Sequence, residues 1–370
     1  MELMIEDLME QLVEKGGSDM HIQAGSPVYF RYSGKLEPVG DEALTPQETQ
    51  RLIFSMLNNS QRKQLEQHWE LDCSYGVKGL ARFRVNVYKE RGCYAACLRA
   101  LSSKIPNYEK LGLPEIVKEM AGRPRGLILV TGPTGSGKTT TLAAILDMIN
   151  RTRYEHVLTV EDPIEYVFPN EKCLFHQRQR GEDTKSFSDA LRSALREDPD
   201  IILVGELRDL ETISLAVTAA ETGHLVFATL HTSSAGATVD RMVDVFPADQ
   251  QEQIRAQLSG SLIAVFSQCL PKKQNPKSGE FGRALAQEIM VVTPAIANQI
   301  REGKTSQIYS SIQTGMKLGM QTMEQSLASW VNQGAISMDE AISKSSKPDE
   351  LYRLTAGGAG KTKAKTNARR

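Results

Sequence analysis

The stretch GPTGSGKTT at residues 132–140 has the residue types and the spacing that bind the phosphates of a nucleotide. It matches the pattern GxxxxGK[ST], in which glycines let successive backbone N–H groups converge on phosphate oxygens. Lys138 is expected to bridge the β- and γ-phosphates, and the Thr139 hydroxyl is expected to hold Mg²⁺. The alternative is a glycine-rich turn that only joins a strand to a helix, so the neighbouring residues decide between the two.

The elements on either side of this stretch favour a phosphate site. Residues 127–130, LILV, form a short apolar run that is typical of a buried strand. Beyond the stretch, apolar side chains recur on one face of a helix at Leu142, Ile145, Leu146 and Ile149. Such a helix directs the positive end of its dipole at a bound anion. We predict that a nucleoside triphosphate binds to Gly132, Pro133, Thr134, Gly135, Ser136, Gly137, Lys138, Thr139 and Thr140.

The motifs that read guanine are missing from the sequence. There is no NKxD motif, and no DxxG motif follows the phosphate loop as the switch of a GTPase would. ATP, accompanied by Mg²⁺, is therefore the predicted ligand.

Acidic residues follow two further apolar runs, VLTV and IILV. The first is followed by Glu161, Asp162 and Glu165, and the second, after one glycine, by Glu206. Ligands of open α/β sheets bind at the carboxyl ends of the strands, so these carboxylates are expected near the phosphates. We predict that Glu206 polarises the attacking water and that Glu161 acts in catalysis and in the Mg²⁺ site. The alternatives are a solvated strand-end carboxylate for Glu206, and helix capping for Asp162 and Glu165.

A third apolar run, LVFAT, has a histidine on each side, His224 before it and His231 after it. At about 3.3 Å per residue of strand, the two are too far apart to share a metal ion. His231 follows the end of the run that faces the nucleotide, and we predict that it responds to the γ-phosphate during hydrolysis. His224 is predicted to serve a subunit or domain contact. For each, the alternative is a hydrogen-bonded structural histidine.

The order of the patterns along the chain predicts more than one domain. Residues 1–105 mix short helical and strand patterns, typical of a small α+β domain, and residues 106–113 are predicted to be a linker. Alternating strands and helices then predict an α/β domain with a parallel sheet, and mostly helices continue it, so that it spans residues 114–355. Residues 356–370 are small, polar and cationic and are expected to be disordered.

Composition excludes several other classes. Lys and Arg number 44 against 45 Asp and Glu, so no overall basic field is available to hold nucleic acid. The apolar runs are far shorter than the roughly 20 residues that cross a bilayer, and the acidic N-terminus does not resemble a signal peptide. The five cysteines contain no CxxC pair, so a zinc site is not expected. We expect a cytoplasmic protein that reaches a membrane only through a partner.

The motifs resemble those of the secretion-type ATPases, which drive type II secretion, type IV pili and related machines. In order and spacing, GPTGSGKTT is similar to the Walker A motif of that family, EDPIE to its Asp box, DPDIILVGELRD to its atypical Walker B motif and TGHLVFATLHT to its His box. The resemblance implies a RecA-like P-loop NTPase core, a smaller PAS-like N-terminal domain and a hexameric ring. It also implies N-terminal arginines that act in catalysis. Arg82, Arg84 and Arg99 stand at the matching positions, of which Arg84 and Arg99 are favoured, with a surface strand arginine as the alternative for each.

The C-terminal sequence IREGKTSQIYSSIQTGMKLGMQTMEQSL is similar to that of the family members that retract type IV pili. Members that assemble pili or drive secretion usually carry a tetracysteine zinc subdomain and a longer N-terminal region, which this sequence lacks. The resemblance therefore implies a hexameric motor for pilus retraction and twitching motility, located at the cytoplasmic side of the inner membrane. The implied partners are the inner-membrane platform protein of the pilus and a paralogous pilus ATPase.

One segment departs from the retraction pattern. The family sequence AIRNLIRE is replaced by AIANQIRE, with Ala297 in place of arginine and Gln299 in place of leucine. This departure motivates a second hypothesis, an accessory or regulatory paralogue of the retraction motor. A pilus assembly or type II secretion ATPase is the third hypothesis, which the missing zinc cysteines disfavour.

Overall fold

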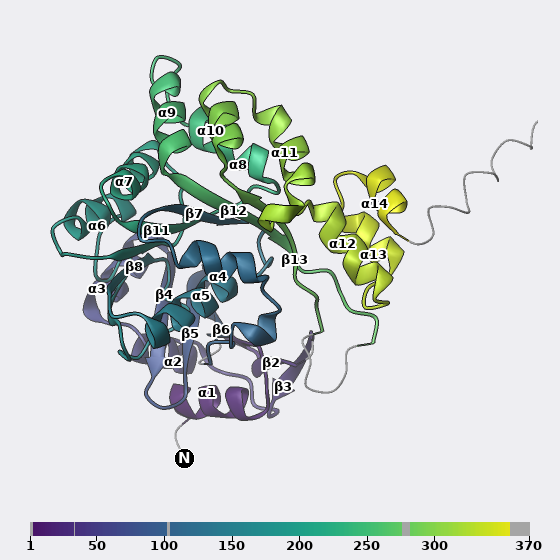
Figure 1. The fold of residues 1–370 in the computed structure, drawn as a ribbon. Coiled ribbons are helices and arrows are strands. Elements are labelled where there is room, and N and C mark those ends of the chain that lie inside the picture. Colours follow the sequence, from purple (N-terminus) through teal and green to yellow (C-terminus); the bar gives the residue numbers. More distant parts are fainter. Residues whose placement is uncertain (1–2, 33, 102–103, 276–281, 356–370) are drawn as a thin grey trace, which may run out of the picture. The chain divides into compact units, whose positions relative to one another are not determined.

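The computed structural model describes residues 3–32, 34–101, 104–275 and 282–355 (Figure 1). The basic tail predicted at residues 356–370 lies outside these ranges. The chain divides into two compact units, the first made of Met1–Ile105 with Asp162–Val167 and the second of Pro106–Glu161 with Phe168–Arg370.

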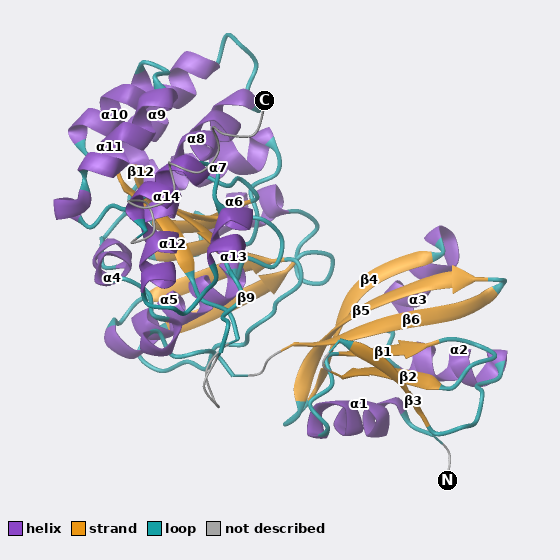
Figure 2. Ribbon diagram, turned by 90° about the vertical axis from the view of Figure 1, so that its right-hand side faces the viewer, coloured by secondary structure: helices purple, strands orange, loops and turns teal. Residues whose placement is uncertain are grey.

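The first unit is an antiparallel sheet of six strands in the order β3-β2-β1-β6-β5-β4, with three helices packed beside it (Figure 2). Along β5, Phe83 and Val85 are buried, whereas Arg84 between them is exposed, as expected for a strand with one face on a core. The elements are β1 (Asp19–Ile22), β2 (Val28–Tyr32), β3 (Lys35–Val39), β4 (Glu70–Val77), β5 (Ala81–Glu90), β6 (Cys93–Leu101), α1 (Ile5–Glu14), α2 (Pro46–Ser55) and α3 (Asn59–His68).

Residues 45–67 have a polar, helical pattern throughout, but they form two helices, α2 and α3. Asn58 separates them because its side chain accepts the backbone N–H of Gln61 while the Gln61 side chain accepts the backbone N–H of Asn58. This reciprocal pair satisfies two N–H groups at the start of α3 and so favours a new helix there.

The second unit is built on a sheet of seven strands in the order β13-β12-β7-β11-β10-β8-β9. All neighbouring pairs are parallel except β12 with β13. The strands are β7 (Gly126–Thr131), β8 (His156–Glu161), β9 (Leu174–Gln179), β10 (Ile201–Val204), β11 (Leu225–Leu230), β12 (Leu262–Cys269) and β13 (Ala286–Val291). Every residue of β7, β10 and β11 is buried, as expected for central strands of a parallel sheet that is covered on both faces.

Helices cover this sheet, with α4 and α5 on one side and α7 to α9 on the other (Figure 1). A smaller apolar core holds together α12 to α14 and the adjoining end of β13. The helices are α4 (Glu115–Ala121), α5 (Lys138–Thr152), α6 (Phe187–Ala194), α7 (Leu210–Glu221), α8 (Ala235–Asp244), α9 (Gln251–Ser261), α10 (Pro294–Arg301), α11 (Ile308–Thr314), α12 (Met323–Asn332), α13 (Met338–Lys344) and α14 (Pro348–Leu354).

The segment predicted as a linker, residues 106–113, is part of the second unit. Its Tyr108 side chain is buried, and the hydroxyl donates a hydrogen bond to the carbonyl oxygen of Pro114 at 3.0 Å. Among the described residues, none of the helices combines the length and the apolar character that crossing a bilayer requires.

Candidate nucleotide-binding and catalytic site

The glycine-rich stretch forms the turn between β7 and α5, as its sequence context predicts. Gly132, Gly135 and Gly137 have φ angles of 142°, 78° and 86°, which residues with a Cβ atom rarely adopt. At Gly132 a Cβ atom would also lie 2.3 Å from the carbonyl oxygen of Gln268. The backbone of the loop, and so the direction of its N–H groups, depends on glycine at these positions.

Lys138 is the first residue of α5, and its side chain turns back over the loop. Its ammonium group donates to the carbonyl oxygens of Gly132 at 2.8 Å and Pro133 at 3.2 Å. Residues 133–135 are exposed and residues 137–140 are half-buried, so a ligand can reach most of the loop. The cation therefore lies inside an accessible loop, at the positive end of a helix.

The strand order brings the other predicted site residues to the same edge of the sheet. Strands β7, β11, β10 and β8 are consecutive neighbours, and their carboxyl ends lie side by side. Gly132 follows β7, His231 follows β11, Glu206 lies just beyond β10, and Glu161 ends β8. The backbone N–H of Gly132 donates to the carbonyl oxygen of Leu230, the residue before His231. The phosphate loop and His231 are therefore direct neighbours.

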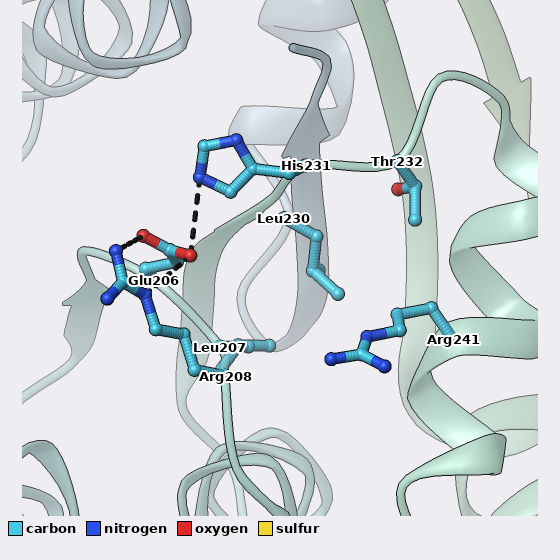
Figure 3. A pocket seen from close by; sticks show the side chains of 7 residues that line it. All are labelled: Glu206, Leu207, Arg208, Leu230, His231, Thr232 and Arg241. Atoms are coloured by element: carbon cyan, nitrogen blue, oxygen red, sulfur yellow. Dashed lines mark hydrogen bonds and ion pairs between the residues drawn. The ribbon is translucent and has the colours of Figure 1, made fainter. Parts of the chain in front are cut away.

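Glu206 lies between two cationic or potentially cationic side chains (Figure 3). Its Oε1 is 2.7 Å from Nε of Arg208 and 3.2 Å from Nε2 of His231, and its Oε2 accepts a second Arg208 hydrogen bond at 2.7 Å. The Glu206 side chain is 20% exposed. Burial by itself raises the pKa of Glu206, but the hydrogen bond and charge of Arg208, with His231, outweigh burial and hold the pKa below its ordinary value. The carboxylate is therefore ionised at neutral pH.

The backbone around Glu206 is held by the neighbouring strands. Leu207 donates its N–H to the carbonyl oxygen of Thr229 at 3.0 Å, and the Thr229 hydroxyl donates to the carbonyl oxygen of Gly205. A Cβ atom on Gly205 would lie 3.1 Å from the carbonyl oxygen of Val160, tighter than most Cβ contacts. Glycine thus lets the turn that carries Glu206 pass close to the end of β8.

Glu161 is buried, 6% exposed, at the last position of β8. One carboxylate oxygen accepts hydrogen bonds from the Thr159 hydroxyl at 2.7 Å and the Gln177 amide at 3.3 Å. Asp162 and Glu165, which follow it in the sequence, group with the first unit of the chain. Glu161 therefore remains the carboxylate that β8 places in the second unit.

A pocket of about 240 Å³ opens beside Glu206 and His231. Figure 3 shows the guanidinium group of Arg241 extending into it from α8, opposite Glu206. Thr232 also lines the pocket, and its hydroxyl is hydrogen bonded to that of Thr238 on α8 at 2.7 Å. Arg208 lies within the Walker B-like sequence, where a surface pair with Asp209 is the expectation from sequence, but it pairs with Glu206 while Asp209 caps α7. Sequence reasoning assigns no role to Arg241, which only the fold brings to the pocket.

The two histidines that flank β11 have different surroundings. His231 contacts Glu206, whereas the Nδ1 atom of His224 lies 3.0 Å from the carbonyl oxygen of Ala219. The backbone N–H of His224 donates to the same oxygen at 3.1 Å. His224 therefore satisfies a carbonyl group near the C-terminal end of α7, which is the structural alternative, and its predicted subunit contact stays a prediction.

Arg84 and Arg99 are cross-strand neighbours on β5 and β6 of the first unit. The Nε of Arg99 donates to Oδ1 of Asp19 on β1 at 2.8 Å. Burial raises the pKa of Asp19, but hydrogen bonds from Arg99 and Ser18 outweigh it and keep the pKa below its ordinary value. Arg99 is thus paired with a buried carboxylate and lies opposite Arg84 in the sheet, and the action of both arginines on the nucleotide stays a prediction.

A family model described as type II/IV secretion system protein matches residues 1–343 of the sequence. The chain belongs to this family. Type IV pilus retraction ATPase PilT of Pseudomonas aeruginosa is 51% identical over 347 residues, which cover 94% of this chain and 99% of that protein. The crystal structure of the pilus retraction motor PilT with bound ADP is similar, with a TM-score of 0.88 at 50% identity, covering 95% of this chain and 100% of that one.

Two further family members show how far the similarity extends. A twitching motility protein of Neisseria gonorrhoeae is 48% identical over 322 residues, which cover 87% of this chain and 85% of that protein. Type IV pilus ATPase PilU of Pseudomonas aeruginosa is 37% identical over 346 residues, which cover 94% of this chain and 90% of that protein. The predicted family and fold class are confirmed: the chain is an α/β ATPase with a RecA-like core and a smaller N-terminal domain, and it binds a nucleotide.

The contact between Arg208 and Glu206 predicts the acid limb of the pH profile of this ATPase. We expect Arg208→Ala to lose activity at a higher pH than the parent, because the substitution removes the hydrogen bond and charge that lower the pKa of Glu206 and leaves burial, which raises it. The measurement is the rate of ATP hydrolysis between pH 4 and pH 8. Arg192→Ala is the matched control, since Arg192 is an exposed arginine that pairs with Glu211. Superimposable acid limbs for parent and Arg208→Ala would contradict the assignment.

Proposed function

We propose that the chain is an ATP-hydrolysing motor of a hexameric ring that powers the retraction of type IV pili, and with it twitching motility. The observation that carries the proposal is the placement of the phosphate loop beside the Glu206–His231 contact at the carboxyl ends of neighbouring strands. This site occurs in a chain that is half identical, over nearly its whole length, to an ATPase named for pilus retraction.

In the proposed mechanism, residues 132–140 bind the phosphates of ATP. The backbone N–H groups of the loop converge on the phosphate oxygens, and Lys138 exchanges its contacts with Gly132 and Pro133 for the β- and γ-phosphates. Mg²⁺ prefers oxygen ligands, so the Thr139 hydroxyl and the Glu161 carboxylate would hold it, and a bound ion would neutralise charge that develops on the phosphates.

Glu206 orients and polarises the water that attacks the γ-phosphate. Its lowered pKa keeps Glu206 ionised at neutral pH. An ionised carboxylate of low pKa is a weak base, so Glu206 suits the orientation of water better than full removal of its proton. His231, which contacts Glu206 and follows the strand beside the phosphate loop, senses the γ-phosphate. Arg84 and Arg99 supply positive charge from the N-terminal domain as the transition state forms.

The proposed domains are the N-terminal domain at residues 1–105 and the ATPase domain at 114–355, followed by the tail at 356–370. Residues 106–113 connect the two domains and group with the second unit. Six subunits form the ring at the cytoplasmic side of the inner membrane, where it engages the platform protein of the pilus and a paralogous pilus ATPase. Each step of hydrolysis drives motion between the N-terminal and ATPase domains.

An accessory paralogue of the retraction motor is the second candidate, because of the segment AIANQIRE. On α10 the amide of Gln299 exchanges hydrogen bonds with the hydroxyl of Ser311 on α11, at 3.0 and 3.1 Å. A leucine at position 299 could make neither bond, so α10 is joined to α11 differently in this chain. This difference is the observation that favours an accessory paralogue over the retraction motor, and it concerns only this segment of the chain.

Deleting the gene and imaging single labelled pili separates the candidates. We expect cells without the motor to carry an excess of extended pili that do not retract, and a plasmid copy to restore retraction. A plasmid copy that carries Lys138→Ala is the control, because it supplies the chain without its predicted phosphate contact. Normal retraction in the deletion strain would favour the accessory paralogue, and loss of all surface pili would favour an assembly ATPase.

A further inference from the structure

Gln268 lies directly behind the phosphate loop, on the side that faces the interior of the second unit. It belongs to β12, is 1% exposed, and its amide Nε2 donates to the carbonyl oxygen of Ser136 at 2.7 Å. In a phosphate loop the N–H groups face the ligand, so buried carbonyl groups on the other side need donors from the protein. Gln268 supplies the donor for Ser136 and thereby favours the orientation of the loop that binds phosphate.

The other end of the Gln268 amide is also occupied. Its Oε1 accepts the hydroxyl of Thr141 on α5 at 3.1 Å and the amide Nε2 of Gln287 at 3.2 Å. Gln287 belongs to β13, is 1% exposed and is the direct cross-strand partner of Gln268. Because the carbonyl oxygen of Ser136 can only accept a hydrogen bond, the amide of Gln268 has one orientation that satisfies all of these contacts.

Gln287 continues the connection into α12. Its backbone N–H donates to the Ser326 hydroxyl at 3.1 Å, and its carbonyl oxygen accepts the amide of Gln321 at 2.9 Å. Ser326 lies on the first turn of α12, and Gln321 directly precedes Thr322, the capping residue of that helix. Buried hydrogen bonds therefore run without interruption from the phosphate loop through β12 and β13 to the start of α12.

Two atoms along this connection have no partner within the described part of the chain. The Ser136 Oγ and the Gln287 Oε1 are both buried and without a hydrogen bond. Buried polar atoms without partners are unfavourable, so rearrangements that give them partners are favoured when the loop changes. The unsatisfied atoms are thus at the loop itself and at the glutamine that contacts α12.

We propose that Gln268 and Gln287 form a relay that couples nucleotide binding at the phosphate loop to the position of α12. The proposal rests on the nucleotide site of the proposed function, and it adds that nucleotide binding changes the position of α12. A ligand that moves the Ser136 carbonyl group shifts the Gln268 amide, which Gln287 follows because the two amides share a hydrogen bond. The shift of Gln287 then changes the contacts that hold the first turn of α12.

Hydrogen–deuterium exchange on the full chain, with and without Mg²⁺–ADP, tests the relay. We expect ADP to protect both the loop peptide and the α12 peptide of the parent. Gln287→Met and Ser326→Ala should keep the protection of the loop but lose about half or more of the response of α12, since local opening depends on local contacts. Gln268→Met should in addition weaken ADP binding about tenfold, because the Ser136 carbonyl loses its donor.

Gln333→Met is the matched control, because Gln333 is exposed at the opposite end of α12 and bonds to Ser329. It should leave both responses unchanged. Should Gln287→Met fail to fold, as judged by circular dichroism, Ser326→Ala carries the test alone. An α12 response that is absent in the parent, or undiminished in the relay variants, overturns the proposal. If the relay proposal is overturned in this way but the same parent sample hydrolyses ATP, the proposed function is still supported. A loop that ADP does not protect, together with no ATP hydrolysis, would reject both the relay and the proposed function.

Discussion

Glu206→Gln is expected to lower the kcat of ATP hydrolysis by about 10²- to 10⁴-fold, the usual contribution of a positioned acid or base. Glutamine has the same shape as glutamate but no charge, so it keeps the turn between β10 and α7 while it stops attracting a proton of the attacking water. Arg208 and His231 lose their anionic partner in the variant, but neither lies in the phosphate loop. Nucleotide affinity should therefore change by less than about threefold, which is below the value of one ordinary hydrogen bond.

Steady-state hydrolysis and binding of a fluorescent ATP analogue measure the two effects separately. Glu221→Gln is the matched control, because this glutamate ends α7 on the surface and accepts a hydrogen bond from Gln257. It should leave hydrolysis unchanged. Full turnover by Glu206→Gln would remove Glu206 from the attack on the γ-phosphate and leave Glu161 as the candidate that β8 places at the same edge of the sheet.

Lys138→Ala is expected to abolish measurable hydrolysis and to weaken ATP binding by about 100-fold, since charged hydrogen bonds to phosphate are the strong ones in such a site. The ammonium group lies within the loop and contacts the carbonyl oxygens of Gly132 and Pro133, where the phosphates of a bound nucleotide would replace those oxygens. Its loss removes the positive charge that faces the β- and γ-phosphates.

The measurement is titration with the same fluorescent analogue, together with phosphate release. Lys304→Ala is a matched control, because Lys304 is an exposed lysine of the second unit that pairs with Glu302. It should bind and hydrolyse ATP as the parent does. Retained affinity and turnover in Lys138→Ala would mean that the glycine loop does not hold the triphosphate, and the proposed site would fail with it.

The phosphate loop is predictable from the sequence because its chemistry is local. The glycines, Lys138 and Thr139 are contiguous, and a buried strand before them and an amphipathic helix after them are visible in the order of apolar residues. The strand-end position of Glu206 is equally local, since it follows the apolar run of β10 after one glycine. Each depends on a few neighbouring residues, so no distant contact is needed to recognise it.

Pairing across the sheet is different, because the strand order β7-β11-β10-β8 is not the order of the chain. Only that order places His231 beside Glu206 and the phosphate loop, whereas the contact of Arg208 with Glu206 is local, two residues along the turn after β10. The break between α2 and α3 likewise depends on one capping pair at Asn58, which the apolar pattern does not show.

The sequence by itself determined the nucleotide chemistry of this protein, the alternating α/β pattern and the residues that end each central strand. The tertiary structure decided which of those residues touch, that His231 lies beside Glu206, and how Gln268 and Gln287 meet behind the phosphate loop. The physical reason is range: backbone turns and helix faces are set by residues within a few positions, whereas hydrogen bonds between strands depend on which strands become neighbours.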